Sequence, residues 1–223
     1  MPLGNGQRAR SNQSDKQMTL TGNPLLVNPT FDNPPANPLM MLQDWLVKAD
    51  EVGVSEPKGL VLSTVDSAGR PSSRVVLLKD CDERGVLFTT SQDSTKGKDL
   101  EANPYAAGTL WWRETIQQVN FQGPVTRLSQ QVSDKEFQAR PRDAQAVAAV
   151  SKQSAPLVDE KELEAQVHEL LHAESKIDRL QGWHAYHLAI ESIEFWHGRT
   201  NRLHRRLRYH LENGTWVHQR LQP

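Results

Sequence analysis

Short segments rich in valine, leucine and threonine, separated by turn sequences, fill the middle of this chain and constrain its fold more than any other feature. The first two, residues 59–65 and 73–79, flank a glycine-containing turn of hairpin length at residues 66–70. A segment at 86–90 follows a turn at 82–85, and segments 105–113 and 116–127 meet across Glu114 and Thr115. The pattern predicts antiparallel strands between neighbours along the chain.

Helical patterns flank these strands. Asn37 followed by Pro38 is typical of a helix start, and apolar residues recur behind this pair until Gly53. Further helices are expected after Ser94, over residues 132–150 with a break at 140–143, and along the stripe Leu163, Val167, Leu170 and Leu171, after which residues 183–196 return to strand-like composition. Without a glycine-rich dinucleotide fingerprint or a P-loop, the chain is expected to be α+β, a single domain built on an antiparallel barrel.

Composition and charge exclude several classes of protein. The 223 residues carry a net charge of −1, which disfavours a general nucleic-acid binder. Cys81 is the one cysteine, so an intrachain disulfide is excluded and a cytoplasmic location is expected. The sequence shows neither a signal-peptide pattern nor an apolar run of about 18 residues, so no membrane association is expected. Residues 1–35 are expected to form a flexible arm before a folded domain at 36–223.

Three clusters of cations and hydroxyls are suited to an anionic ligand. Arg74 and Lys79 bracket an apolar segment that we expect to be a buried strand, and buried cations require anions. Residues 94–98 combine hydroxyls and lysines at a helix start, where free backbone N–H groups and the helix dipole favour phosphate. Residues 151–154 add further donors. Each signal alone is weak, and the helix start taken by itself is better explained as an ordinary capped surface helix.

The stretch 199–209 concentrates arginines beside an aromatic segment at 193–196. If residues 202–209 are extended, one face gathers Arg202, His204, Arg206 and Arg208, whereas Leu203, Arg205, Leu207 and Tyr209 point the other way. Such a face suits a planar, anionic ligand. The alternative is a solvated basic edge strand that resists aggregation.

Sequence motifs for side-chain catalysis are missing. No nucleophile elbow, zinc-binding HExxH helix or cysteine-protease signature occurs. His184 and His187 lie three apart on an expected strand and face opposite sides, so a shared metal ion is not expected. An anion-lined site without such machinery indicates a cofactor that supplies the chemistry itself.

Five motifs in register resemble the pyridoxamine 5′-phosphate oxidase family of flavin enzymes. They are Ser73-Arg-Val-Val-Leu-Leu-Lys79, Arg140-Pro-Arg-Asp143, Val150-Ser-Lys-Gln-Ser154, Ile193-Glu-Phe-Trp196 and Arg202-Leu-His204. Their order and spacing match the family from about residue 36 to the C-terminus. The resemblance implies a split β-barrel homodimer that holds FMN at the subunit interface.

Carried over position by position, the resemblance assigns roles to individual residues. It implies that Arg74, Ser94 and Lys96 bind the FMN phosphate, and that Gln153 and Ser154 reach the same cofactor from the partner subunit. Residues implied around the ribityl chain and the flavin ring are Val75, Val76, Leu77, Lys79, Thr89, Thr90, Gln118, Trp196 and Arg206. Lys79, Arg140, Arg202 and His204 are implied to face the substrate.

Two departures from the vitamin B6 enzymes bear on the substrate. Where those enzymes hold the substrate phosphate with a tyrosine, an arginine and a serine, this chain has Glu136, Arg140 and Ala144. Residues 111–115, 117–118, 203–209 and 220–223, with residues 19–22 of the arm, resemble instead the flavin oxidases of phenazine biosynthesis. That branch implies oxidation of reduced phenazine carboxylates, with FMN taking the hydride and O2 reoxidising it. The alternatives are a pyridoxine/pyridoxamine 5′-phosphate oxidase, in keeping with Lys79, and a non-catalytic flavin-binding barrel.

Overall fold

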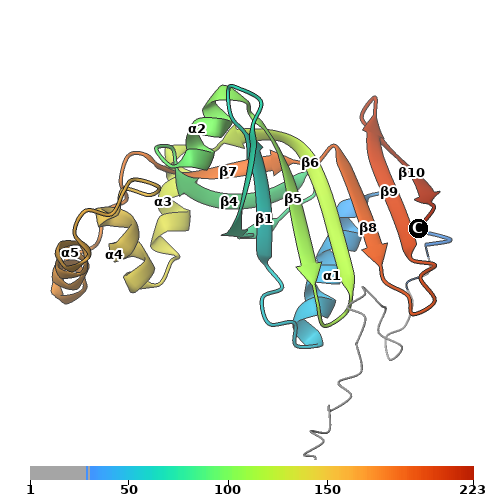
Figure 1. Ribbon diagram of the computed structural model, residues 1–223, viewed down its shortest axis with the longest axis horizontal. Coiled ribbons are helices and arrows are strands. Elements are labelled where there is room, and N and C mark those ends of the chain that lie inside the picture. The colour runs from blue at the N-terminus through green and yellow to red at the C-terminus, as the bar shows by residue number, and fades with distance from the viewer. Residues whose placement is uncertain (1–28, 30) are drawn as a thin grey trace, which may run out of the picture.

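A single antiparallel sheet organises the computed structural model, which describes residue 29 and residues 31–223 (Figure 1). The strand order is β10-β9-β8-β6-β5-β1-β2, and β7 joins β6 to β4, which also pairs with β3. The strands are β1 Gly59–Val65, β2 Pro71–Leu77, β3 Asp80–Cys81, β4 Gly85–Ser91, β5 Tyr105–Trp112, β6 Gln117–Arg127, β7 Trp183–Ala189, β8 Ser192–His197, β9 Arg205–Glu212 and β10 Thr215–Leu221. The helices are α1 Pro38–Glu51, α2 Thr95–Ala102, α3 Gln130–Gln138, α4 Arg142–Val150 and α5 Glu160–His172.

Strand β6 closes the half-barrel because it belongs to two ladders. Its first residues lie between β5 and β8, whereas its last residues pair with β7, with Val125 opposite Leu188. Gly123 lies at this crossing, where an added Cβ would approach the carbonyl oxygen of Ala189 to 1.8 Å. Only glycine permits this approach of the two backbones. The predicted α+β split barrel is confirmed.

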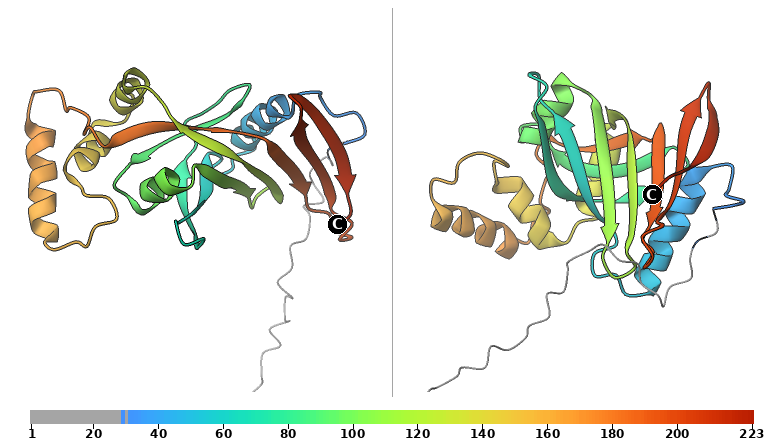
Figure 2. Two further views of the ribbon diagram at one scale, coloured as in Figure 1. Left: turned by 90° about the horizontal axis from the view of Figure 1, so that it is seen from above. Right: turned by 45° about the vertical axis from the view of Figure 1, so that its right-hand side comes forward.

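Helix α1 covers one face of the sheet (Figures 1 and 2). The Asn37 side chain accepts a hydrogen bond of 2.9 Å from the backbone N–H of Leu39, so the predicted cap is formed. The Trp45 ring lies 5.1 Å from Phe195 and 6.2 Å from Trp112, which seats the helix on β5 and β8. The face that α1 covers is the core face, and the opposite face of these strands is called the outer sheet face below.

Helices α3, α4 and α5 lie at one end of the molecule, outside the sheet (Figure 2). Their small core contains Phe137, Ala146, Ile177 and Trp183. The predicted break in the segment 132–150 is confirmed, because α3 ends at Gln138 and α4 begins at Arg142. The polar loop between α4 and α5 runs back toward β4.

Two expectations about strands are wrong. Strand β2 ends at Leu77 and is not buried: Val75 is 69% and Leu77 is 54% exposed, because β2 is an edge strand covered on its core face only. Strand β9 begins at Arg205, since Arg202 has φ 66° and lies in a turn. The four cations of residues 202–208 therefore do not share one strand face.

The folded part of the chain reaches back to Phe31, which is 2% exposed and stacks on Trp45 at 6.2 Å. The phenol of Tyr209 donates to the carbonyl oxygen of Pro35 at 2.9 Å, which ties this segment to β9. Most of the expected arm, including residues 19–22, lies outside the described residues, so its flexibility stays a prediction. Within the described residues, no helix is long and apolar enough to cross a membrane.

Candidate functional site

The start of helix α2 gathers cations and hydroxyls. The Ser94 side chain caps the helix by accepting from Gly97 N–H at 3.2 Å. An added Cβ at Gly97 would lie 2.4 Å from the Ser91 carbonyl oxygen, so glycine lets the helix begin against the end of β4. Together with Arg74, Thr90, Lys96, Gln153 and Ser154, Ser94 forms what we call the anion cluster.

Lys96 is a buried cation with hydroxyl partners. It is 6% exposed, and its Nζ donates to Thr90 Oγ1 at 3.1 Å and to Ser94 Oγ at 3.4 Å. In the described part of the chain, no carboxylate lies within ion-pair distance of it. Burial and the neighbouring Arg74 lower the pKa of Lys96, although Asp99 acts in the opposite direction. A buried ammonium without a counter-ion is suited to receive an anion.

Arg74 approaches the same region from β2 with its side chain on the core face. One terminal nitrogen, Nη1, donates to Thr64 Oγ1 at 2.7 Å and to the Leu62 carbonyl oxygen at 3.2 Å. The other, Nη2, donates to Ser72 Oγ at 2.5 Å. Burial lowers the pKa of Arg74, and the charge of Asp99 opposes this shift. The guanidinium group is therefore held by neutral oxygens at hydrogen-bond distance, with the Asp99 carboxylate 3.7 Å from Nη2.

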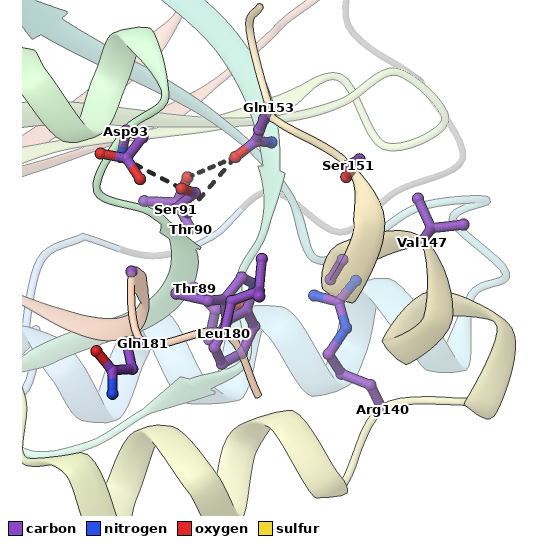
Figure 3. A pocket seen from close by; sticks show the side chains of 13 residues that line it. Thr89, Thr90, Ser91, Asp93, Arg140, Val147, Ser151, Gln153, Leu180 and Gln181 are labelled. Atoms are coloured by element: carbon purple, nitrogen blue, oxygen red, sulfur yellow. Dashed lines mark hydrogen bonds between the residues drawn. The ribbon is translucent and has the colours of Figure 1, made fainter. Parts of the chain in front are cut away.

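Gln153 (Figure 3) and Ser154 reach the anion cluster from the loop after α4. Thr90 Oγ1 donates to Gln153 Oε1 at 3.1 Å, and Thr95 N–H donates to Ser154 Oγ at 3.3 Å. Ser154 has φ 71°. The expectation that these two residues come from the partner subunit differs from this geometry, because the loop returns to β4 of its own chain.

A pocket of about 330 Å³ opens beside the cluster, between β4, α4 and the segment before β7 (Figure 3). Its lining includes Thr89, Thr90 and Arg140 but neither Glu136 nor Ala144. Arg140 Nη2 donates to the Ala144 carbonyl oxygen at 3.1 Å, and its guanidinium lies 5.4 Å from the Trp183 ring. The buried Arg140 Nε has no partner among the described residues. This arginine retains a donor for a ligand.

A second group of predicted residues lies on the outer sheet face, over β5, β6, β8 and β9. Its hollow of about 610 Å³ is lined by Gln118, Trp196, Arg206, Arg208 and Glu194, which with His204 we call the outer-face cluster. Glu194 is 7% exposed and accepts from Arg206 Nε and Arg208 Nη2, both at 2.7 Å. Burial raises the pKa of Glu194, but the bonds from Arg206 and Arg208 outweigh it and lower the pKa overall.

The loop before β9 brings His204 to this cluster. Its ring lies 4.8 Å from that of Trp196, and its Nδ1 accepts from Arg199 N–H at 3.1 Å. Burial and Arg202 lower the pKa of His204, so the imidazole is neutral near pH 7. Arg202 is exposed in the same loop, and Lys79 lies between β2 and β3.

The predicted residues therefore form two groups within one chain. Arg74 points to the core face, since it lies opposite Leu62, whereas Gln118 and Trp196 point to the outer face. Sequence reasoning missed the supports of both groups. No sequence pattern pointed to Asp99. Glu194 belongs to the motif 193–196, but no role was predicted for it.

Family models match most of the chain. A model described as pyridoxamine 5′-phosphate oxidase matches residues 47–173. A second, described as the pyridoxine 5′-phosphate oxidase C-terminal dimerisation region, matches residues 183–223. The two matches together include both clusters.

Individual relatives of the chain are named for two different activities. The chain is 40% identical to a dihydrophenazinedicarboxylate synthase of Pseudomonas chlororaphis over 92% of both chains. It is 44% identical to a pyridoxine/pyridoxamine 5′-phosphate oxidase of Mannheimia succiniciproducens over 84% of this chain and 89% of that one. The crystal structure of PhzG from Burkholderia lata, in complex with tetrahydrophenazine-1-carboxylic acid, superposes with a TM-score of 0.86 at 39% identity, covering 89% of this chain and 98% of the other.

Proposed function

Because this chain belongs to the pyridoxamine 5′-phosphate oxidase family, we propose that it is an FMN-dependent oxidase of phenazine biosynthesis. Its substrates are dihydro- or tetrahydrophenazine carboxylic acids, and O2 is the final electron acceptor. The single cysteine is in keeping with an enzyme of the cytoplasm. The observation that supports FMN as the cofactor is the anion cluster, where buried Lys96 has hydroxyl partners and, among the described residues, no carboxylate within ion-pair distance.

The anion cluster fits the phosphate of FMN. Two cations, a capped helix start and several hydroxyls converge there, and phosphate requires charge-assisted donors of this kind. In the proposal, Arg74, Ser94, Lys96, Gln153 and Ser154 hold the phosphate. The β2 and β4 residues Val75, Val76, Leu77, Thr89 and Thr90, with Lys79 after β2, are proposed to surround the remainder of the cofactor.

The outer-face residues Gln118, Trp196 and Arg206 belong to the same site only if a second copy supplies them. They point away from the anion cluster of their own chain, so one cofactor contacts both groups at an interface between two copies. The match to a dimerisation region at 183–223 and the exposed Val75 and Leu77 support a homodimer. The folded domain that forms this dimer is proposed to be residues 36–223, and the end of the segment before it packs on this domain through Phe31.

The residues of the chain bind and orient, since FMN when bound supplies the redox chemistry by accepting a hydride and passing the electrons to O2. Arg202 provides the positive charge for a substrate carboxylate. His204, neutral near pH 7, provides a hydrogen bond without adding charge. Trp196 offers a flat apolar surface for fused rings. Lys79 and Arg140 are proposed as further cations facing the substrate.

Two substitutions favour the phenazine branch over the vitamin B6 branch. A phosphate dianion next to Glu136 would meet a negative charge, and Ala144 offers no hydroxyl. The loss of such bonds costs several kcal/mol, on the order of 2–4. A phenazine carboxylate carries less charge and needs fewer donors, so Glu136 and Ala144 disfavour it less.

Anaerobic bleaching of the visible flavin absorbance tests the proposal. FMN-loaded protein is mixed in parallel with a freshly reduced phenazine carboxylate and with pyridoxamine 5′-phosphate. We expect bleaching by the phenazine alone, and a Glu136→Tyr/Ala144→Ser variant should gain a response to the vitamin. Bleaching by the vitamin alone would assign the wild-type protein to cofactor salvage. A protein that loads FMN but responds to neither donor would support a non-catalytic flavin binder.

A further inference from the structure

Asp99 is a buried carboxylate beneath the anion cluster. It lies on α2, is 5% exposed, and its Oδ2 accepts from Thr64 Oγ1 at 2.6 Å and from Ser72 Oγ at 3.1 Å. The same oxygen lies 3.7 Å from Arg74 Nη2. One carboxylate oxygen on α2 thus links the side chains of β1 and β2.

The two hydroxyls between Asp99 and Arg74 are directed by this carboxylate. A hydroxyl has one proton, and an ionised carboxylate can only accept. Because Thr64 and Ser72 give their protons to Asp99, each presents a lone pair to the guanidinium, at 2.7 Å and 2.5 Å respectively. Without Asp99 the hydroxyls are free to rotate, and Arg74 loses the acceptors that fix its direction.

The position of Asp99 also joins the two halves of the anion cluster. Helix α2 carries Ser94 and Lys96 at its start, whereas Arg74 belongs to β2. The Asp99 carboxylate spans the two elements, so it sets the position of one cation relative to the other. A doubly charged group that needs both cations at once is sensitive to that position.

We propose that Asp99 is a positioning residue for the phosphate subsite, holding Arg74 through Thr64 and Ser72. The inference rests on the proposed function, in which the anion cluster holds the FMN phosphate. It does not depend on which substrate the enzyme oxidises.

The test compares two ligands that differ by the phosphate alone. The Kd values of FMN and of riboflavin, which lacks the phosphate, are measured by quenching of flavin fluorescence. We expect Asp99→Ala to weaken FMN binding about tenfold, or 1.4 kcal/mol, with riboflavin binding unchanged. Asp99→Asn keeps one acceptor oxygen and should weaken FMN less. Glu101→Gln, an exposed position on the same helix, removes the same charge and should change neither Kd.

The outcomes separate the inference from the function beneath it. If wild-type protein binds FMN no better than riboflavin, the anion cluster is not a phosphate subsite, and the proposed cofactor is contradicted as well. If wild-type protein prefers FMN and Asp99→Ala keeps that preference or strengthens it, the positioning role is wrong although the cofactor stands. Should Asp99→Ala fail to fold, Ser72→Ala decides, because it removes the hydroxyl that links Asp99 to Arg74 Nη2, and an unchanged FMN preference in that variant would overturn the proposal.

Discussion

The anion cluster and the outer-face cluster both gather cations, but Lys96 of the first differs from the arginines of the second in having no carboxylate within ion-pair distance among the described residues. Lys96 lies buried beside hydroxyls, whereas Arg206 and Arg208 share the buried carboxylate of Glu194. A cation without a carboxylate keeps its charge for a ligand, and a cation paired with one is held in a fixed direction. The anion cluster therefore contributes mainly to the affinity for an anionic ligand. The outer-face cluster contributes a fixed shape and directed hydrogen bonds.

Lys96→Met should have the largest effect on the difference between the two clusters. It removes the cation without a counter-ion, and we expect FMN affinity to fall on the order of 100-fold, as for the loss of a strong charge-assisted bond. Equilibrium titration of flavin fluorescence measures the change. Lys98→Met on the exposed side of the same helix is the control and should bind FMN normally. Equal losses in both variants would mean that overall charge governs binding.

Arg202→Ala and His204→Ala test the substrate side of the outer-face cluster. Each should slow anaerobic flavin reduction by about 10- to 100-fold, through lost orientation of the substrate, and leave the FMN Kd unchanged. Stopped-flow absorbance gives the rates. Leu203→Ala, at an exposed position between them, should reduce at the wild-type rate. Release of FMN from the first two variants would contradict their assignment to substrate.

Glu194→Gln sharpens the contrast by removing the carboxylate that holds two arginines. We expect a loss of about 1–2 kcal/mol in the free energy of unfolding, modest because both arginines are partly exposed. The pKa of folded Glu194 is lowered, so its contribution is present above the ordinary glutamate range and is lost as pH falls through the lowered pKa. Urea unfolding should show the gap to wild type closing in acid. Glu212→Gln on β9 is the control, and a gap that persists in acid would contradict the ion-pair explanation.

The smallest expected effect is the pH dependence of FMN binding. Burial and Arg74 lower the pKa of Lys96, and a bound anion favours its charged form. FMN affinity should therefore fall several-fold as pH rises through the lowered pKa of Lys96, and the comparison is made above the second pKa of the phosphate, where the phosphate charge is constant. Isothermal titration at each pH measures this, and a Lys96→Arg variant should give a flat profile. A wild-type profile that is equally flat would place the lysine outside the phosphate site.

Local patterns in the sequence predicted most elements because each depends on a few adjacent residues. The cap at Asn37, the hairpin turn at 66–70 and the break near Arg140 all appear where chain chemistry requires them. Burial was expected for residues 75–78, and Leu78 is buried, but Val75 and Leu77 are exposed because β2 has a neighbour on one side and cover on one face only. Exposed apolar residues of an edge strand look the same in sequence as core residues.

The site was predictable as a set of residues but less so as an arrangement. Two features could not be predicted from the sequence. The turn at Arg202 depends on a positive φ, and the contact of Gln153 with β4 of its own chain depends on the path of the chain through α3 and α4. Asp99 and Glu194 look like ordinary acidic residues in the sequence. Their importance comes from burial beside arginines on other strands.

The crossing of β6 has a consequence for the order in which the molecule is built. The ladder from Val125 to Leu188 closes only after α3, α4 and α5 have been made, and joining such distant segments is slow and entropically costly. Strand β4, which carries Thr90, takes its long partner β7 from beyond that excursion. We therefore expect a growing chain on the ribosome to become able to bind an anion late, after most of the polypeptide has emerged.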